Sequence, residues 1–454
     1  MGSINTPEPL KVGIIGAGIA GLGTAVALRN KGHHVEIFEQ SRFKYEIGAA
    51  ITLPPNGVVA IKELGIDLEQ GKPIVTEHYH LLAGDTLQTK AEDDTRYLNE
   101  QYGNYMYNFS RVELHDLLRR EAVKPNREGV PVAINLGCKT TDVNAEEGII
   151  VLEDGRSVQK DLVVIADGVH TKFTPAICGK SILPTKNGRS AFRGLIPFPA
   201  IHAHRELGPY FRDNVKPGFW IPSSPDHSVH VVTYPCGQTP FLNLVVLHYT
   251  LPKYADAESW TTPADNSDCV AAAVGFHPIV HELLKLSSDT KVHTLHIKEP
   301  LPTLVKGRAV IIGDAAAPHQ PQLAQGASTA LMCAAALGMV FDPELRPVHP
   351  TSSSAAAIDL SVQARLDHFN KVLHHRSTLA QLMSDAIPYN PNDPFKVQQR
   401  QRLEELAVGH EREYVLPPTD HPPLGPMVRD VLYGYDVVKG MKAYLGEQGL
   451  VLGR

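Results

Sequence analysis

The chain has 454 residues, of which 43% are apolar and 20% are charged, and its formal net charge is −6 at pH 7. This composition is ordinary for a globular protein and excludes a fibrous or disordered chain. Charges of both signs are mixed along the sequence without a long basic run, which disfavours nucleic acid and anionic membranes as partners and favours a small molecule.

Cysteine, histidine and hydropathy patterns exclude further classes. The five cysteines are widely spaced and odd in number, so we expect reduced, buried thiols rather than a CxxC motif or a disulfide framework. The 22 histidines include no HExxH context and no companion acids or cysteines, so no metal site is predicted. No run approaches the ~18 apolar residues of a membrane span.

The N-terminus has no apolar segment of the kind found in a signal peptide. Its first residues, MGSINT, fit the loose pattern for myristoylation, but Pro7 and Glu8 follow directly and favour an unmodified tail. We therefore expect a cytoplasmic protein.

The first elements in chain order form a βαβ unit. Residues 11–15 predict an apolar strand, residues 19–31 have helical spacing, and residues 34–38 alternate as a second strand. The sequence GAGIAG lies between the first strand and the helix, the setting in which GxGxxG binds a dinucleotide.

Each glycine of this motif has its own expected task. Gly16 makes the tight turn, Gly18 lets the backbone approach a pyrophosphate, and Gly21 allows the helix to pack closely on the strand. The helix N-terminus then offers free N–H groups to phosphate. Glu39 ends the second strand about 20 residues after the first glycine, where an acid binds the adenosine ribose.

The next segments predict loops and a helix near this unit. A turn and short strand in YEIGAAITLPPN place small residues such as Ala50 where a flat ring could lie against them. Ser110 is the predicted N-cap of a helix, with Glu113 completing a capping box. Arg111 in the first turn could reach a pyrophosphate or pair with Glu113 or Glu121.

Two later apolar strands end in acids. Residues 161–166 lead into Asp167, and residues 308–312 lead into Gly313 and Asp314, so both carboxylates are expected at the carboxyl edge of one sheet. The second strand opens the motif GDAAAPHQPQLAQG, which ends at Gly326 and leads into a helix over residues 327–341. Together with the first unit, these strands predict one nucleotide-binding sheet assembled from distant segments.

The segment between these motifs differs in character. Residues 190–197, 228–234 and 241–249 read as strands, and short helices are expected within 255–286. An exposed loop is expected over 342–357 and a helix over 358–386, and the proline-rich last ~65 residues are expected to wrap the surface. The expected division is 1–185, 186–298, 299–341 and 342–454.

In order and spacing, these motifs resemble the group A flavoprotein monooxygenases, in particular the salicylate-hydroxylase-like branch that includes fungal phenol and polyketide hydroxylases. The resemblance covers about residues 11–381. It implies an α/β fold: a Rossmann-like FAD-binding domain, an inserted antiparallel-sheet substrate domain and a C-terminal helical region.

The resemblance also implies roles for particular residues. The cofactor would be non-covalent FAD, held by Gly16, Gly18, Gly21, Glu39, Ala50, Arg111, Asp167, Asp314, Gly326 and Ala327. Arg193 and Tyr234 would face the substrate oxygen as the catalytic pair. An alternative polar contact is His319, with Gln320 beside it, on the loop expected to face the flavin.

The chain departs from the family pattern at three places. Ala317 stands where a histidine usually follows GDAA, Thr174 where the ADG segment usually reaches an arginine, and residues 331–333 where an acid is usual. These positions are expected near the flavin or nicotinamide, so they bear on flavin reduction and coupling more than on FAD binding.

The resemblance implies a single-component monooxygenase. NADH or NADPH would visit briefly, since no second GxGxxG is present, and O2 would form a flavin hydroperoxide that hydroxylates an electron-rich, phenolic substrate, plausibly in secondary metabolism. Three alternatives stay open: a flavin-dependent epoxidase or dearomatising enzyme, an FAD dehydrogenase, and a catalytically inactive binding protein.

Overall fold

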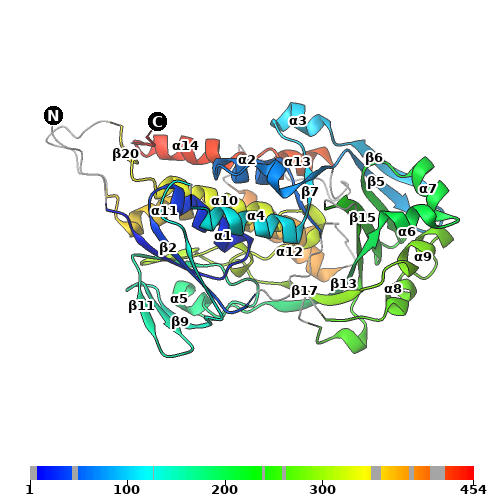
Figure 1. The fold of residues 1–454 in the computed structure, drawn as a ribbon, viewed down its shortest axis with the longest axis horizontal. Helices are drawn as coiled ribbons and strands as arrows, with labels where there is room; N and C mark the ends of the chain where they lie inside the picture. Colours follow the sequence, from blue (N-terminus) through cyan, green and yellow to red (C-terminus); the bar gives the residue numbers. More distant parts are fainter. Residues whose placement is uncertain are drawn as a thin grey trace.

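The structure is a computed structural model that describes residues 8–42, 50–125, 127–237, 241–257, 262–348, 359–387, 393–408 and 425–453. Figure 1 shows two sheets side by side, a six-stranded sheet with its helices at the left and a seven-stranded sheet with its own helices at the right. The myristoylation pattern and the first half of YEIGAAITLPPN lie outside the described residues.

The six-stranded sheet assembles the predicted nucleotide-binding strands from distant parts of the chain. Its neighbours are parallel except for the β18–β19 pair at one edge. The four apolar strands expected near residues 11, 34, 161 and 308 are confirmed. The order is β18 (Val305–Lys306), β19 (Ala309–Ile311), β12 (Leu162–Ile165), β1 (Lys11–Ile15), β2 (His34–Glu39) and β8 (Ala133–Leu136).

Helices rich in small residues pack closely over this sheet. A Cβ on Gly338 would lie 3.1 Å from the Cβ of Ala27, so α10 and α1 approach through residues that lack bulk. The opposite face is covered by a small sheet, whose Ile150 reaches Gly13 of β1. These elements are α1 (Ile19–Asn30), α2 (Pro55–Glu63), α4 (Arg111–Val123), α10 (Gly326–Val340), β9 (Thr140–Asn144), β10 (Ile149–Leu152) and β11 (Ser157–Gln159).

The seven-stranded sheet contains the expected inserted strands and two more. All neighbours are antiparallel except β5 and β14, which run parallel. Strands β5 and β6 come from residues 78–94, upstream of the expected segment 186–298. They were not expected from the sequence because β5 joins the sheet by pairing with β14, which is distant in sequence. The order is β17 (Lys291–Ile297), β13 (Thr185–Pro197), β16 (Phe241–Tyr249), β15 (His230–Cys236), β14 (Gly218–Ser223), β5 (His78–Ala83) and β6 (Thr89–Asp94).

Each face of the seven-stranded sheet belongs to a different hydrophobic cluster. The outer face packs under helices drawn at the far right of Figure 1. The inner face carries Tyr234 and Phe219, which pack with Ala50 of β3 (Ala50–Leu53) and with Leu323. The inner face therefore lies at the junction of the two parts. The outer helices are α6 (Phe198–Ala203), α7 (Leu207–Asn214), α8 (Asn266–Ala272) and α9 (Pro278–Lys285), with the 3-10 helix η2 (Pro252–Tyr254).

The C-terminal part is more buried than the proline-rich sequence suggests. Arg429 is 1% exposed and forms an ion pair with Asp93. Met441 is fully buried. The expectation that this part merely wraps the surface is wrong for the described residues, since its helices pack into both cores. They are α11 (Val362–Ala386), α12 (Pro394–Ala407), α13 (Pro426–Leu432) and α14 (Val437–Glu447), and β20 (Arg346–Pro347) pairs with β21 (Leu450–Val451).

A three-stranded sheet connects the glycine loop region to α4. Ser110 ends β7 opposite Ala50 and is also the N-cap residue of α4, but no side chain caps the helix, so the predicted capping box is wrong. This sheet contains β3 (Ala50–Leu53), β7 (Tyr107–Ser110) and β4 (Ile74–Val75), and nearby lie α3 (Tyr97–Tyr102) and the 3-10 helix η1 (Leu68–Gly71).

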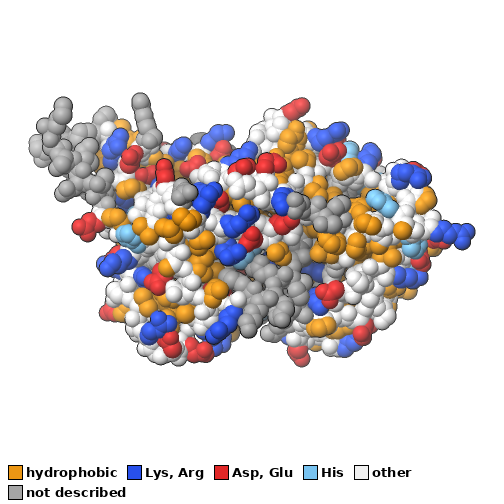
Figure 2. Space-filling model, in the orientation of Figure 1, with side chains coloured by type: hydrophobic (Ala, Val, Ile, Leu, Met, Phe, Trp, Pro, Cys, Tyr) orange, Lys and Arg blue, Asp and Glu red, His pale blue; other side chains and the backbone are white. Residues whose placement is uncertain are grey.

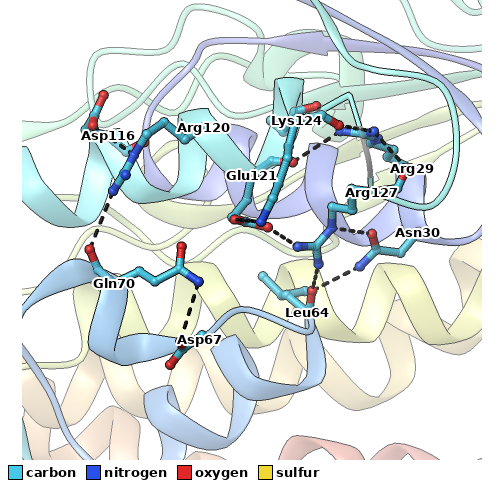
Figure 3. Close-up of polar contacts among 11 residues, drawn as sticks. Arg29, Asn30, Leu64, Asp67, Gln70, Asp116, Arg120, Glu121, Lys124 and Arg127 are labelled. Carbon is cyan, nitrogen blue, oxygen red and sulfur yellow. Dashed lines mark hydrogen bonds and ion pairs between the residues drawn. The ribbon is translucent and has the colours of Figure 1, made fainter.

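The C-terminus of α4 is held by one buried arginine of α1 (Figure 3). Arg29 is fully buried and donates hydrogen bonds to five carbonyl oxygens in and after α4, those of Glu121, Ala122, Lys124, Arg127 and Gly129. These carbonyls have no partners within the helix, and the guanidinium charge suits the negative end of the helix dipole. The contact fixes α4 against α1.

The mixed surface charge and the free thiols match the sequence expectations, but burial of the cysteines was expected for all five and holds for three. Figure 2 shows basic and acidic side chains interspersed on one face of the molecule. The five thiols are free, three of them buried and two half-buried. Within the described residues, no helix combines the length and apolarity needed to cross a membrane.

Candidate functional site: a dinucleotide cradle facing a buried arginine and tyrosine

The three glycines of the loop between β1 and α1 have three different surroundings. Gly16 has φ +96°, and a Cβ there would lie 2.5 Å from the carbonyl oxygen of Ala166. A Cβ on Gly21 would lie 2.0 Å from the carbonyl oxygen of Gly16. A Cβ on Gly18 would meet nothing within 4 Å. The fold therefore requires two of these glycines, whereas the third borders open space.

A helix N-terminus and a carboxylate lie beside the loop. Gly18 is the N-cap residue of α1 and no side chain caps the helix, so its first N–H groups have no partner within the helix. Glu39 accepts hydrogen bonds of 2.7 Å from the N–H groups of Ala17 and Ser41. Its carboxylate thus lies against the glycine loop, where a ribose-binding acid is expected.

Two more acids follow strands at the same edge of the sheet. The order β19-β12-β1 makes these strand ends neighbours, with Asp167 after β12 and Asp314 in the 3-10 helix η3 (Gly313–Ala315) after β19. Oδ1 of Asp167 is buried without a hydrogen-bond partner among the described residues. The carboxyl edge of such a sheet is where ligands bind.

The surrounding protein disfavours the ionised form of both carboxyls. Burial raises the pKa of Asp167 to about 6, opposed by a hydrogen bond from Thr171 and by the charge of Lys298. Burial also raises the pKa of Asp314 to about 6, opposed by Arg111 and Lys298. Asp314 is nevertheless accessible to solvent. A side chain that is accessible yet closely surrounded lines a hollow rather than an open surface.

The charges of two cations, Arg111 and Lys298, act on the Asp314 carboxylate. Arg111 begins α4 and lies close enough to lower the pKa of Asp314. The alternative partner Glu121 lies at the other end of α4 and pairs with Lys124 and Arg127, so that alternative is wrong. Lys298 follows β17, and nothing in its local sequence distinguishes it from a surface lysine at a strand end.

The N-terminus of α10 faces the same hollow. A Cβ on Gly326, its first residue, would lie 3.9 Å from Oδ1 of Asp314, and Ala327 follows as a buried residue. Gln325 is the N-cap residue, but its side chain is bound to Asn56 and Leu323 instead of capping the helix. The first N–H groups of α10 therefore lie beside Asp314 and have no partners within the helix. The 3-10 helix η4 (Pro321–Leu323) precedes α10 in the chain.

The predicted substrate residues lie together on the inner face of the seven-stranded sheet. Arg193 in β13 is opposite Val245 of β16, and Tyr234 in β15 is opposite Asn243, two residues along the same strand. The two side chains are close enough for the charge of Arg193 to lower the pKa of Tyr234. The Tyr234 hydroxyl donates a 3.3 Å hydrogen bond to the carbonyl oxygen of Ala50.

Burial sets the ionisation of this pair. It lowers the pKa of Arg193 to about 10, which leaves the guanidinium protonated at neutral pH. It raises the pKa of Tyr234 to about 12, so the hydroxyl remains a neutral donor. The pair thus presents one cation and one neutral donor beside Ala50.

Asn243 is a buried polar residue that the sequence did not single out. It is fully buried, and its Oδ1 accepts a 3.1 Å hydrogen bond from the N–H of Ala50. Its Nδ2 has no partner among the described residues. Both backbone groups of Ala50 are therefore bound by side chains of the seven-stranded sheet, Asn243 and Tyr234, and these bonds join the two parts. A polar residue in an apolar strand was the available signal.

The alternative pocket around His319 and Gln320 is occupied by structural contacts. The Gln320 amide donates to the carbonyl of His296 at 2.8 Å and accepts from Asn187 at 3.0 Å. Burial lowers the pKa of His319 to about 4, and its Nε2 lies 3.3 Å from the hydroxyl of Thr329. His319 is therefore neutral at physiological pH and Gln320 already has partners.

The three departures from the family pattern lie in packed surroundings. Thr174 is fully buried in α5 (Thr174–Cys178), where its hydroxyl accepts a 2.9 Å hydrogen bond from the N–H of Ile182. Ala317 is 4% exposed, and Leu331, Met332 and Cys333 are buried in α10. These residues therefore contribute to the core of the FAD-binding part.

Comparison with family models identifies the nucleotide-binding part. The family described as FAD binding domain matches residues 9–346. The match includes the glycine loop, both strand-end acids and the N-terminus of α10, and it spans the seven-stranded sheet.

Curated relatives and solved structures agree with this match. Hispidin-3-hydroxylase from Neonothopanus nambi is 28% identical over 410 residues, covering 88% of this chain and 94% of the relative. The 3-amino-4-hydroxybenzoate 2-monooxygenase from Streptomyces cremeus is 28% identical over 338 residues, covering 71% and 76%. A salicylate hydroxylase substrate complex has the same fold, with a TM-score of 0.68, 21% identity and coverage of 96% and 98%.

Proposed function

This chain belongs to the FAD binding domain family as an FAD-dependent monooxygenase, and we propose that it inserts one atom of O2 into a phenolic ring, with NADH or NADPH as the reductant. The other oxygen atom leaves as water. The observation that carries the substrate class is the buried pair of Arg193 and Tyr234 beside Ala50.

The residues at the carboxyl edge of the six-stranded sheet fit FAD. The uncapped N-termini of α1 and α10 suit a pyrophosphate and the electron-rich edge of a flavin, respectively. The carboxylates accept hydrogen bonds from hydroxyl groups, and FAD supplies the activation of O2 once it is reduced. We assign FAD to Gly16, Gly18, Gly21, Glu39, Ala50, Arg111, Asp167, Asp314, Gly326 and Ala327.

Arg193 and Tyr234 would prepare the aromatic ring. A phenolate is more electron-rich than the phenol, and the protonated Arg193 stabilises it by a charge-assisted hydrogen bond. Tyr234 keeps its proton, and when substrate binds its hydroxyl would turn from the Ala50 carbonyl to donate to the same oxygen, which orients the ring. The apolar inner face around Val245 and Leu195 excludes water from the pocket.

The function is tested with a library of phenols supplied with NADPH or NADH in air. The expected product is heavier by one oxygen atom, and the oxygen comes from labelled O2. Electron transfer to a substrate without oxygen would favour an FAD dehydrogenase, an epoxide would favour the epoxidase, and absence of any turnover would favour an inactive protein.

Arg193→Ala tests the substrate pair. Because a charge-assisted hydrogen bond contributes roughly 1.5–3 kcal/mol, we expect kcat/KM for hydroxylation to fall roughly ten- to a hundredfold with normal FAD content. Tyr234→Phe removes a neutral donor and has a smaller effect. Product formation falls more than NADPH oxidation, as measured by the ratio of product to NADPH consumed.

Arg189→Ala is the matched control. Arg189 lies four residues earlier in β13, and its guanidinium carbon is 4.8 Å from the centre of the Tyr249 ring. Because Arg189 is outside the proposed substrate pair, hydroxylation by Arg189→Ala should change little. If Arg193→Ala hydroxylates as well as the wild type, or instead loses FAD, Arg193 has a structural role and the assignment of the pair is wrong.

A further inference from the structure

Lys298 lies where the chain returns from the seven-stranded sheet to the FAD-binding part. It follows β17 directly and is 4% exposed. Its Nζ donates a 2.5 Å hydrogen bond to the carbonyl oxygen of Ala315, the last residue of η3. Its own carbonyl oxygen accepts a 2.7 Å hydrogen bond from Nε2 of Gln381 in α11. The ammonium group is thus fixed against the turn that carries Asp314.

A charged group in this place requires an explanation beyond one hydrogen bond. A neutral donor could satisfy the Ala315 carbonyl without the penalty of burying an ammonium group. The charge of Lys298, however, acts on two carboxylates from different strands, Asp167 after β12 and Asp314 after β19. Burial disfavours the ionised form of both carboxyls, and the charge of a nearby cation favours it.

We propose that Lys298 is a positioning residue of the FAD site, which holds the Asp314 turn through Ala315 and supplies the positive charge that keeps Asp167 and Asp314 ionised. Ionised carboxylates accept hydrogen bonds at both oxygens, as the hydroxyl groups of FAD require. The proposal rests on FAD binding alone and is independent of the hydroxylated substrate.

The other charged or titratable groups nearby come from three elements. Arg111 of α4 acts on Asp314, Glu39 of β2 acts on Asp167, and Cys178 of α5 acts on Lys298. Burial raises the pKa of the Cys178 thiol, so it stays neutral near pH 8. Burial lowers the pKa of Lys298 to about 8, against the pull of Asp167, Cys178 and Asp314, which makes Lys298 the group that titrates just above neutral pH.

The proposal predicts a bell-shaped pH dependence of FAD binding. The dissociation constant, measured by fluorescence titration of the protein stripped of FAD, should be lowest between about pH 6 and 8. Binding weakens below this window as the carboxyls gain protons. It weakens above the window as Lys298 loses its charge, by about fivefold or more at pH 9.5.

Variants separate the charge from the packing of the side chain. Lys298→Met should raise the dissociation constant about tenfold or more at pH 7, because it removes the cation whose charge acts on both carboxylates. It should also abolish the alkaline weakening and move the acid weakening to higher pH. Lys298→Arg should restore binding at pH 7 and move the alkaline limit upward. Lys306→Met, an exposed lysine of β18, is the matched control and should leave binding unchanged.

Two results would overturn the proposal. One is wild-type affinity and an unchanged pH profile in Lys298→Met. The other needs no variant, and so applies even if Lys298→Met does not fold: a wild-type dissociation constant that stays constant between pH 7 and 9.5. A failure of hydroxylation with intact FAD binding would contradict the proposed function and leave this inference standing.

Discussion

At the scale of single residues, the glycine loop separates what the fold needs from what the cofactor needs. Gly21 has no room for a methyl group, since its Cβ would lie 2.0 Å from the carbonyl oxygen of Gly16. Gly18 has room, and its φ of −75° and ψ of −173° suit any residue. Neither packing nor backbone conformation requires glycine at position 18, so we attribute it to the close approach of a ligand.

The pair Gly21→Ala and Gly18→Ala should therefore behave differently. Gly21→Ala should lower the free energy of unfolding by about 2–4 kcal/mol through overpacking. Gly18→Ala should keep the Tm of the protein without FAD within about 2 °C and weaken FAD binding about tenfold, because its methyl group lies where the pyrophosphate approaches. Thermal unfolding and FAD titration measure the two effects, and equal losses in both assays would contradict the distinction.

Replacing the Asp314 carboxylate should raise the stability of the protein without FAD and weaken FAD binding. Its pKa is raised to about 6 in the folded protein, so its contribution to stability is present at low pH and is lost as pH rises through about 6. At pH 8, Asp314→Asn should therefore raise the Tm of the protein without FAD while most of the yellow colour is lost. A lower Tm without FAD, or full flavin content, would show that the carboxylate is structural.

At the scale of elements, the site depends on how α4 is held. Its first residue, Arg111, acts on Asp314, and its far end is fixed by Arg29 of α1. A helix held at its C-terminus keeps its N-terminal side chain in place. The buried arginine therefore acts on the site through the helix and not by contact.

Arg29→Met should destabilise the protein by about 3 kcal/mol or more, because five carbonyl oxygens lose the hydrogen bonds that Arg29 donates. FAD binding should also weaken as α4 shifts. Denaturant unfolding measures the change, with Arg120→Met as control: Arg120 is exposed on the same helix, and its loss should change stability by less than about 0.5 kcal/mol. Similar losses for both variants would remove the special role of Arg29.

At the scale of the whole molecule, the site is completed by two parts of the chain. The six-stranded sheet and its helices supply the cofactor residues, and the seven-stranded sheet supplies Arg193 and Tyr234. They meet at Ala50, whose N–H and carbonyl are bound by Asn243 and Tyr234. On the proposed assignment of these residues, substrate bound on the seven-stranded sheet would therefore adjoin the flavin.

NAD(P)H oxidation should accordingly be slow without an aromatic substrate and rise when one is bound. GxGxxG occurs once in the sequence, so we expect the proposed nicotinamide reductant to use a transient site. Parallel records of NADPH absorbance and oxygen uptake measure the response. NADPH oxidation that is fast and indifferent to every aromatic offered would contradict substrate control.

The glycine loop and the acids at 167 and 314 were predictable because each follows a strand with a local apolar pattern and has glycine beside it. Glu39 was predictable because it ends the second strand of the βαβ unit. The family, the α/β fold and FAD binding follow from them. The roles of residues that contact partners distant in the sequence were harder to predict. The capping box at Ser110 was wrong because capping depends on where that side chain lies, which the motif does not encode.

Three features were decided only by the tertiary structure: the places of Lys298 and Asn243, and the entry of β5 and β6 into the seven-stranded sheet. The short sequence around Lys298 resembles that of any surface lysine, and its burial results from packing against Ala315 and Gln381, at positions 17 and 83 residues away. Local sequence determines turns, strands and helix starts, since these depend on neighbouring residues. Charge balance at a site depends on which distant residues the fold brings together, and this is why the cation that acts on both carboxylates is evident only in three dimensions.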